Sequence, residues 1–331
     1  MQAASLSSLV RRPWRDATLP ADAIGIPTML SKDERRVLYG LARDHARDDA
    51  AIVDAGCFLG GSTAALLAGV RDREEPWTGP PVASYDLFRV EAYTMQKFFR
   101  DDPGLEVGDS FRDRFDANVA RFDVPHVVRE GDITSIGWDG GPIDLLFLDV
   151  LKSWEINDAV LRDFFPALVP GRSVIVHQDY AGGYMPWIAI TVELMRDSLV
   201  LVDWMEWGSH VHFVERELPA SLIEQGVCGL DAAERFELID RAIARADGWV
   251  RGMLEIDRAA LVVDRDGKEA GLAALGSIAE RYRGHGVVLS TVEAKKQGLE
   301  TDWTYGTGAE PGWSTRLTSA RRRLGSALER G

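Results

Sequence analysis

The stretch from Ala51 to Thr63, AIVDAGCFLGGST, decides the fold of this chain. Its first five residues have the apolar character of a short buried strand, and glycines follow at positions 56, 60 and 61. A buried strand that runs into a glycine-rich turn and then a small-residue helix is typical of α/β proteins, where such turns bind ligands. The stretch alone leaves the ligand open between a dinucleotide, a phosphate and another group.

Strands and helices alternate along the chain on the C-terminal side of this stretch. A helix is expected just before it, at 31–46, because Ser31 and Glu34 have the spacing of a capping box. Further strands are expected at 81–88, 125–133, 142–150, 173–180, 199–207 and 209–217, and further helices at 60–69, 111–122, 154–168 and 188–197. The pattern predicts an α/β fold, a doubly wound and mostly parallel seven-stranded sheet with an antiparallel edge strand.

Three regions are expected. Residues 1–30 form an N-terminal arm, residues 31–219 the α/β domain, and residues 220–331 a mainly helical C-terminal extension. Within the extension, 230–250 is amphipathic, more helix is expected between 253 and 283, and 313–331 reads as a short basic helix or a frayed tail. Such an extension serves as a lid, a homo-oligomer contact or both, and its composition does not rank these roles.

Composition excludes several classes of partner. The chain has 331 residues, a formal net charge of -14 and a pI near 5.0, so its surface repels nucleic acid and anionic lipid. It has two cysteines, no apolar run that approaches 18 residues, and no secretory signal pattern at its N-terminus. We therefore expect a soluble, cytoplasmic protein with reduced thiols, no nucleic-acid partner and no membrane segment.

Acidic residues close the predicted strands. Asp54, Asp86, Asp132 and Asp149 end four of them, and Asp179 follows the next. Ligands bind at the carboxyl ends of strands in doubly wound sheets, so this repetition indicates a site. The glycine turn lacks the G-x-G-x-x-G spacing of nicotinamide and flavin folds, which disfavours a dehydrogenase, and no lysine precedes Ser62 as in a phosphate loop.

The placement of the acids narrows the ligand. An acid ahead of the glycines, Asp54, suits an ammonium group, and an acid at the end of the second strand, Asp86, suits a ribose diol, because a carboxylate accepts two hydroxyl hydrogen bonds. A ligand that combines an ammonium group with a ribose is S-adenosylmethionine.

The motifs VDAGCFLGGST, SYDLF, EGDI, IDLLFLDV and PGRSVIVHQDY together resemble class I S-adenosylmethionine-dependent methyltransferases, over about residues 30–215. More narrowly, they resemble the macrocin-type branch of metal-assisted O-methyltransferases that act on sugar hydroxyls. The resemblance implies that Asp54, Gly56 and Gly60 line the methionine part of the cofactor, with Phe58, Gly61 and Ser62 nearby. It also implies that Asp86 holds the ribose and Asp132 the adenine amino group, with Ile133 against the ring. Phe58 and Ile133 have core packing as an alternative reading.

The acceptor end of the site departs from the family pattern. The resemblance implies an Mg²⁺ site in which Asp149, Gln178 and Asp179 are the candidate ligands, but Lys152 stands in place of a histidine base and Gln178 in place of an acid. The loss of one carboxylate and the gain of a lysine both weaken a cation site.

Lys152 has two alternative roles. It is a candidate base if burial lowers its pKa, or it pairs with Asp149 or Asp179 and replaces the metal. His177 is a second candidate base, with a buried structural histidine as the alternative.

The sequence thus predicts an enzyme, an S-adenosylmethionine-dependent O-methyltransferase of a small polar acceptor such as a sugar. Aromatic residues at 154, 180, 184 and 187 suit a sugar ring at the mouth of the site. The alternative is a non-catalytic cofactor-binding or regulatory module of the same fold, because Lys152 and Gln178 depart from the pattern.

Overall fold

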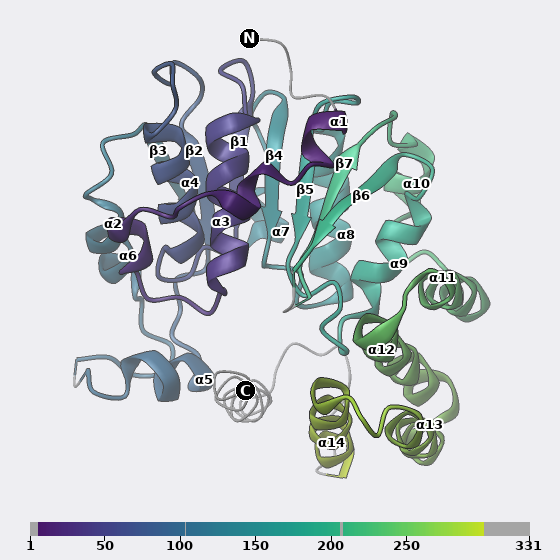
Figure 1. The fold of residues 1–331 in the computed structure, drawn as a ribbon. Coiled ribbons are helices and arrows are strands. Elements are labelled where there is room, and N and C mark those ends of the chain that lie inside the picture. The colour runs from purple at the N-terminus through teal and green to yellow at the C-terminus, as the bar shows by residue number, and fades with distance from the viewer. Residues whose placement is uncertain (1–5, 103, 206–207, 301–331) are drawn as a thin grey trace.

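A seven-stranded sheet forms the centre of the computed structural model, which describes residues 6–102, 104–205 and 208–300 (Figure 1). The strand order is β3-β2-β1-β4-β5-β7-β6. The strands are β1 (Ala51–Ala55), β2 (Val82–Asp86), β3 (His126–Glu130), β4 (Ile143–Leu148), β5 (Val174–His177), β6 (Leu199–Trp204) and β7 (His210–Val214). Strands β1 to β5 are parallel, which confirms the predicted doubly wound sheet.

The sequence predicted an antiparallel strand at the edge of the sheet, and this prediction is wrong. Strand β7 lies between β5 and β6 and is antiparallel to both. The short connection between β6 and β7 allows these strands to pair as a hairpin, and β7 then pairs with β5. The edge strand is therefore β6, which runs in the same direction as β5.

Helices cover both faces of the sheet. Helices α3 (Lys32–Asp44), α4 (Gly61–Arg71) and α6 (Arg112–Val119) share one cluster of buried apolar side chains with it. Helices α8 (Trp154–Phe164) and α9 (Pro186–Leu194) share the other. The predicted capping box is confirmed at the start of α3, where Ser31 Oγ accepts from Glu34 N at 3.2 Å and Glu34 Oε2 accepts from Ser31 N at 2.7 Å. Short segments α7 (Ile133–Ile136) and η3 (Phe165–Ala167) complete the connections.

The N-terminal arm is packed against the sheet rather than extended from it. It contains α1 (Leu6–Leu9), the short turn η1 (Pro13–Asp16) and α2 (Ala21–Ile24). Trp14 Nε1 donates to Asp203 Oδ2 of β6 at 2.9 Å, and Arg15 Nη2 lies 2.7 Å from Asp203 Oδ1. The arm thus ties the start of the chain to the far edge of the sheet.

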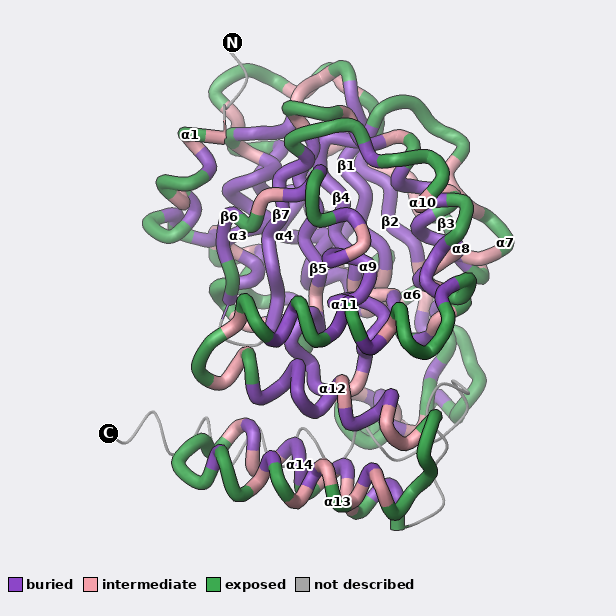
Figure 2. The backbone as a smooth tube through the Cα atoms, turned by 90° about the vertical axis from the view of Figure 1, so that its right-hand side faces the viewer, coloured by how far each residue is buried: buried purple, intermediate pink, exposed green. Residues whose placement is uncertain are grey.

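The C-terminal extension is helical as expected, over the part of it that the structure describes. It contains α10 (Ala220–Gln225), α11 (Ala232–Arg245), α12 (Gly248–Asp266), α13 (Lys268–Arg281) and α14 (Gly286–Glu300). Figure 2 shows α11 to α14 stacked beyond the sheet, with a largely buried α12 between α11 and the pair α13 and α14. One cluster of buried side chains continues from the strands into these helices as far as Leu299. The segment 313–331 lies outside the described residues.

The loop after β2 contains helical turns that the sequence analysis did not predict. These are α5 (Ala92–Thr94) and the π-helical segment η2 (Met95–Phe99). In Figure 1 both α5 and α14 lie at the lower end of the molecule, on the side of the carboxyl ends of the parallel strands. The predicted ligand end of the sheet is thus flanked by elements from two distant parts of the chain.

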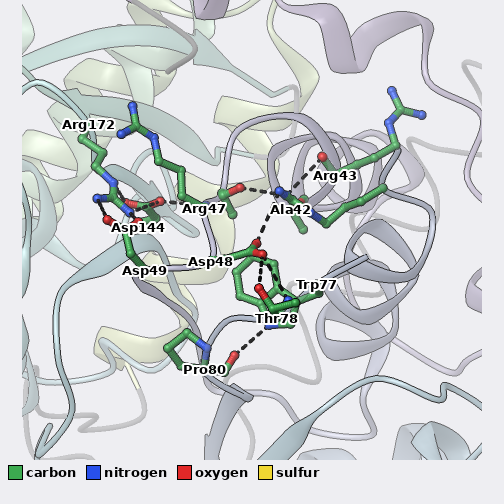
Figure 3. Close-up of polar contacts among 12 residues, drawn as sticks. Ala42, Arg43, Arg47, Asp48, Asp49, Trp77, Thr78, Pro80, Asp144 and Arg172 are labelled. Atoms are coloured by element: carbon green, nitrogen blue, oxygen red, sulfur yellow. Dashed lines mark hydrogen bonds and ion pairs between the residues drawn. The ribbon is translucent and has the colours of Figure 1, made fainter. Parts of the chain in front are cut away.

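The amino ends of the strands are closed by polar contacts (Figure 3). Arg172 Nη2 lies 2.9 Å from Asp144 Oδ2 at the start of β4, and the same guanidinium pairs with Asp49. Nearby, Asp48 Oδ2 accepts from Thr78 Oγ1 at 2.6 Å. These contacts fix the loops at this end, opposite to the strand-end acids. Among the described residues, no helix has the length and apolar character needed to cross a bilayer.

Candidate active site

The turn after β1 requires glycine at its first position. Gly56 has φ +96°, and a Cβ there would lie 2.7 Å from the backbone carbonyl atoms of Asp149, at the end of β4. The backbone N–H of Gly56 donates to Tyr85 O at 2.9 Å. The turn is thus fitted tightly between the ends of β2 and β4, and a side chain at this position would require the backbone to shift.

Helix α6 and the N-terminal arm support the same turn from outside. Gly60 has φ +92° and would place a Cβ 2.9 Å from Val119 Cγ1. Asn118 Nδ2 donates to Leu59 O at 2.8 Å. A Cβ at Gly61 would collide with the side chain of Thr28 in the arm. The predicted cofactor turn is therefore held by the ends of β2 and β4, by α6 and by the N-terminal arm.

Asp54 is fully buried below this turn. Its Oδ2 atom accepts from Ser62 Oγ at 2.9 Å and from Thr63 Oγ1 at 2.5 Å. Burial raises the pKa of Asp54 to about 7, although these two hydroxyls oppose the shift. Its Oδ1 atom is buried and has no hydrogen-bond partner among the described residues. A buried acceptor without a donor is costly, so this oxygen suits a ligand that brings one.

Sequence reasoning missed Thr63, which makes the shorter of the two hydrogen bonds to Asp54. A usable signal was present, because Ser62 and Thr63 are consecutive hydroxyl residues in the first turn of α4. Side chains there point back toward the strand that precedes the helix.

Asp86 receives two backbone N–H groups at the end of β2. Phe58 N donates to its Oδ2 atom and Phe88 N to its Oδ1 atom, both at 2.8 Å. Phe58 and Phe88 have φ values of +46° and +52°, so Asp86 holds two non-glycine residues in the left-handed region. Each carboxylate oxygen keeps a second lone pair after these contacts.

The Phe58 ring packs among aromatic side chains. Its centroid lies 4.9 Å from that of Phe98 and 5.3 Å from that of Phe111. Phe58 is half-buried, so it joins this cluster and still keeps an exposed edge. Both readings of this residue, core packing and cofactor lining, fit that position.

Asp132 and Ile133 follow β3 and lie next to the end of β2. Asp132 is exposed and is the N-cap of α7, where its Oδ1 atom accepts from Thr134 N at 2.9 Å. Ile133 is buried. Gly131 N donates to Asp86 O at 3.0 Å, which joins this segment to the one that carries Asp86. The acids Asp54, Asp86 and Asp132 thus end three adjacent parallel strands.

Lys152 lies between the two acids that follow β4 and β5. Its Nζ atom is 2.7 Å from Asp149 Oδ1 and 2.9 Å from Asp179 Oδ2. The side chain of Lys152 is 47% exposed, against 17% for Asp149 and 6% for Asp179. The pKa of Lys152 is raised, because the two carboxylates outweigh the opposing effect of burial. A base role needed a lowered pKa, so the structure favours the alternative prediction, an ion pair.

His177 lies within the sheet face covered by α9. It is fully buried, and its Nδ1 atom is 3.3 Å from His212 Nδ1. The ring of His210 stacks on that of Tyr180 with centroids 3.8 Å apart. Burial lowers the pKa values of His177 and His210 to about 3, so both rings are neutral near pH 7. This environment is that of the buried structural histidine we gave as the alternative.

Two of the four aromatic residues expected at the mouth are core side chains. Tyr180 and Trp187 are buried, and Trp187 Nε1 donates to Leu151 O at 2.8 Å. Trp154 is half-buried and stacks beneath the guanidinium of Arg235, 4.4 Å from its ring centroid. The prediction of an aromatic mouth is therefore wrong for Tyr180 and Trp187, because both point into the apolar layer under α9.

Comparisons with known proteins give similarities at the level of solved structures. No protein-family profile and no curated protein sequence matches the chain. Two structures of CalS11, a TDP-rhamnose 3′-O-methyltransferase of calicheamicin biosynthesis, match with 16% identity and TM-score 0.40. They cover 63% of this chain and 92% or 91% of theirs. The methyltransferase PaMTH1 of Podospora anserina, bound to S-adenosylhomocysteine, matches with 16% identity and TM-score 0.37, over 65% of this chain and 91% of its own.

The strand order itself decides the fold, because β7 lies antiparallel between β5 and β6 in an otherwise parallel sheet. The chain therefore has an α/β fold with a doubly wound, mostly parallel seven-stranded sheet.

A metal ion does not fit between Asp149 and Asp179 at the ends of β4 and β5. The ammonium group of Lys152 lies between Asp149 and Asp179, where two of the three candidate ligands would have to meet a cation. The third candidate, Gln178, has a buried Oε1 atom with no hydrogen-bond partner among the described residues. Across the described part of the chain, no group of three or more His, Cys, Asp or Glu side chains has the arrangement of a metal site.

Proposed function

We propose that this chain is an S-adenosylmethionine-dependent O-methyltransferase that acts on a small polar acceptor such as a sugar hydroxyl. The observation that supports this most directly is the convergence of Asp54, Asp86 and Asp132 at the ends of three adjacent parallel strands, around a turn with two left-handed glycines. Ligands of doubly wound sheets bind at this edge. The acidic edge suits a ligand with a cationic end and hydroxyl groups.

The residues present fit S-adenosylmethionine. The unpartnered Oδ1 atom of Asp54 suits the ammonium group of its methionine part. The free lone pairs of Asp86 suit the ribose hydroxyls, and exposed Asp132 suits the adenine amino group, with Ile133 beside it. When bound, the cofactor supplies an electrophilic methyl group on a sulfonium centre.

The acceptor end has to hold a hydroxyl group and receive its proton. Both acids contact Lys152, and we assign proton acceptance to Asp149 because its side chain is the more exposed of the two. Lys152 stays charged and stabilises negative charge on the acceptor oxygen as the proton leaves. His177 is fully buried, so we leave it outside this reaction.

We further propose that α12 and α14 form one wall of the acceptor site. The loop after β5 carries Asp179 and then contacts these helices: Met185 N donates to Asp257 Oδ1 at 2.9 Å, and Lys295 Nζ lies 4.4 Å from the ring centroid of Tyr184. Asp257 and Lys295 are both fully buried. The extension then acts at the acceptor end of the site, which corresponds to the first of the two roles left open by the sequence, a lid or a homo-oligomer contact.

A variant tests the role of this wall. Lys295→Met keeps the length of the side chain and removes its charge beside Tyr184. We expect a several-fold higher KM for the acceptor and an unchanged affinity for S-adenosylmethionine, since the cofactor residues lie on other strands. A fall in cofactor affinity as large as the rise in KM would contradict this assignment.

Calorimetry tests the proposed function at its first step. We expect binding of both S-adenosylmethionine and S-adenosylhomocysteine in the micromolar range, and no binding of NAD, which serves as the control. The absence of binding by either compound at high micromolar concentration would refute the proposal.

The competing function is a cofactor-binding module without catalysis. Lys152 in place of a histidine and Gln178 in place of an acid are the residues that favour it. Turnover against a broad panel of sugars and phenols separates the two. Tight cofactor binding without methylation of any acceptor would favour the module.

A further inference from the structure

Two acids at adjacent strand ends converge on one lysine. Strands β4 and β5 pair in parallel, with Leu148 opposite His177, so the residues that follow them emerge side by side. Asp149 and Asp179 both contact Lys152 Nζ, at 2.7 and 2.9 Å. These are the distances of charge-assisted hydrogen bonds, and two acceptors fix the ammonium group in direction as well as position.

The backbone on both sides of this contact is constrained. Lys152 N donates to Val150 O at 2.7 Å, and the next residue, Ser153, caps α8 by accepting from Ile156 N at 3.3 Å. Asp179 has φ +63°, and its carbonyl oxygen accepts from Gly182 N at 2.9 Å. A non-glycine residue in the left-handed region costs about 1 to 2 kcal/mol and persists where the surroundings hold it. Both partners of the ion pair are therefore placed by local structure.

The charges between Asp149 and Asp179 favour a monovalent ammonium group over a divalent metal ion. Asp149 and Asp179 supply two negative charges, and the neutral Gln178 stands beside them with its Oε1 atom buried. A divalent ion here would be about as close to the carboxylates as Lys152 Nζ is, so it would have to displace that charge or bear its repulsion at short range. The ammonium group has three N–H donors, and the two carboxylates account for two of them.

We propose that Lys152 is a built-in cation that takes the place of a divalent metal between Asp149 and Asp179, and that its third N–H binds the acceptor oxygen. The proposal rests on the proposed function for the identity of the acceptor, but the exclusion of metal from this position does not depend on it. Because Lys152 is half exposed while both acids are largely covered, the lysine is the member of the group that an incoming acceptor meets first.

Binding of Mn²⁺, followed by electron paramagnetic resonance on the full chain, tests the exclusion of metal. We expect the wild-type chain to bind no Mn²⁺ at this site below about 1 mM. We expect the double variant Lys152→Ala, Gln178→Asp to bind Mn²⁺ at least about 100-fold more tightly, because it removes one positive charge and adds one negative charge next to the ion. Lys32→Ala is the matched control, since Lys32 is exposed and lies on α3.

Two results would overturn the proposal. One is wild-type binding of Mn²⁺ in the micromolar range that Asp179→Asn abolishes. The other is a folded double variant, confirmed by circular dichroism, that binds Mn²⁺ no better than wild type. With an acceptor in hand, turnover that is unchanged by EDTA supports the proposal, and turnover that needs added Mg²⁺ contradicts it. Failure of cofactor calorimetry would instead refute the proposed function and leave the Mn²⁺ result as an independent outcome.

Discussion

At the scale of the residue, the two carboxylate oxygens of Asp54 have different surroundings. One oxygen is held by Ser62 and Thr63, and the other is buried without a partner. Its charge is costly to bury, which the raised pKa of Asp54 reflects. A carboxylate that is buried at this cost in free energy is a candidate for function. A substitution of Asp54 therefore tests whether the residue acts in ligand binding or in stability.

We predict that Asp54→Asn lowers the affinity for S-adenosylmethionine by about 10-fold to 100-fold, the value of a lost hydrogen bond to a charged group. The asparagine keeps an acceptor oxygen for Ser62 and Thr63 and places an NH₂ donor where the free oxygen was, so we expect the protein to remain folded. Calorimetry measures the change, with the exposed Asp113→Asn on α6 as control. Equal affinities for a folded Asp54→Asn protein and wild type would remove Asp54 from the site.

Gly56 and Gly108 allow a matched test of close packing. Their φ values are +96° and +97°, but a Cβ at Gly56 would lie 2.7 Å from backbone atoms of Asp149, whereas nothing lies within 4 Å of one at Gly108. Alanine at either position has the same backbone strain. We predict that Gly56→Ala lowers the free energy of unfolding by about 1 to 3 kcal/mol more than Gly108→Ala does, as measured by urea denaturation. Similar losses would mean that the turn relaxes away from β4.

At the scale of the element, strands β5 and β7 bring three neutral histidines together. His177, His210 and His212 face α9 from adjacent strands, and Arg196 disfavours a further positive charge at His212. The pKa of His210 is lowered to about 3 by burial and by His177. A histidine whose pKa is lower in the folded state than in the unfolded state stabilises the fold fully above about pH 6.5 and loses that contribution as the pH falls toward 3.

We predict that His210→Gln reduces the loss of stability in acid. Between pH 7 and pH 5, wild type should lose about 2 kcal/mol more of its free energy of unfolding than the variant does. The reason is that the unfolded wild-type chain takes up a proton on His210 that the folded chain does not, which costs about 1.4 kcal/mol per pH unit below about pH 6.5. Asp54 and Asp149, whose pKa values are raised to about 7, act in the opposite direction in both proteins and cancel in the difference. His285→Gln, at an exposed ring, is the control. Parallel pH profiles for His210→Gln and wild type would show that the buried ring is protonated in the folded state.

At the scale of the whole molecule, the helical extension shares its core with the sheet. Side chains of α9, α11 and α12 belong to one buried cluster with β4 and β5. We predict a single calorimetric unfolding transition for the full chain. Truncation after Pro219 should yield an aggregated product, because it exposes the apolar face of α9. Two separate transitions, or a folded truncated protein, would establish the extension as an independent domain.

Much of this arrangement could be predicted from the sequence, since it rests on local patterns. The capping box at Ser31, the apolar strands and the acids at their ends all follow from spacing within a few residues. The position of β7 inside the sheet and the burial of Tyr180 and Trp187 could not, because they depend on which strands pair and which face α9 covers.

The candidate site also has one part that could be predicted from the sequence and one part that could not. The residues proposed to bind the cofactor lie in short motifs. The double contact of Lys152 instead depends on two strand ends that meet in space, and Asp149 and Asp179 are 30 residues apart in sequence. Spacing along the chain placed Lys152 near Asp149, but only the pairing of β4 with β5 brings Asp179 to the same nitrogen.

The attachment of the N-terminal arm has a consequence for the order of synthesis. Trp14 and Arg15 bind Asp203, which leaves the ribosome almost 190 residues later. At a synthesis rate of about 5 to 20 residues per second, Asp203 is made about 10 to 40 seconds after Trp14 and Arg15. Throughout that interval Trp14 can pack against Gly40 of α3, but its Nε1 donor has no acceptor in β6. The contact that fixes the arm to the edge of the sheet is therefore among the last to form during synthesis.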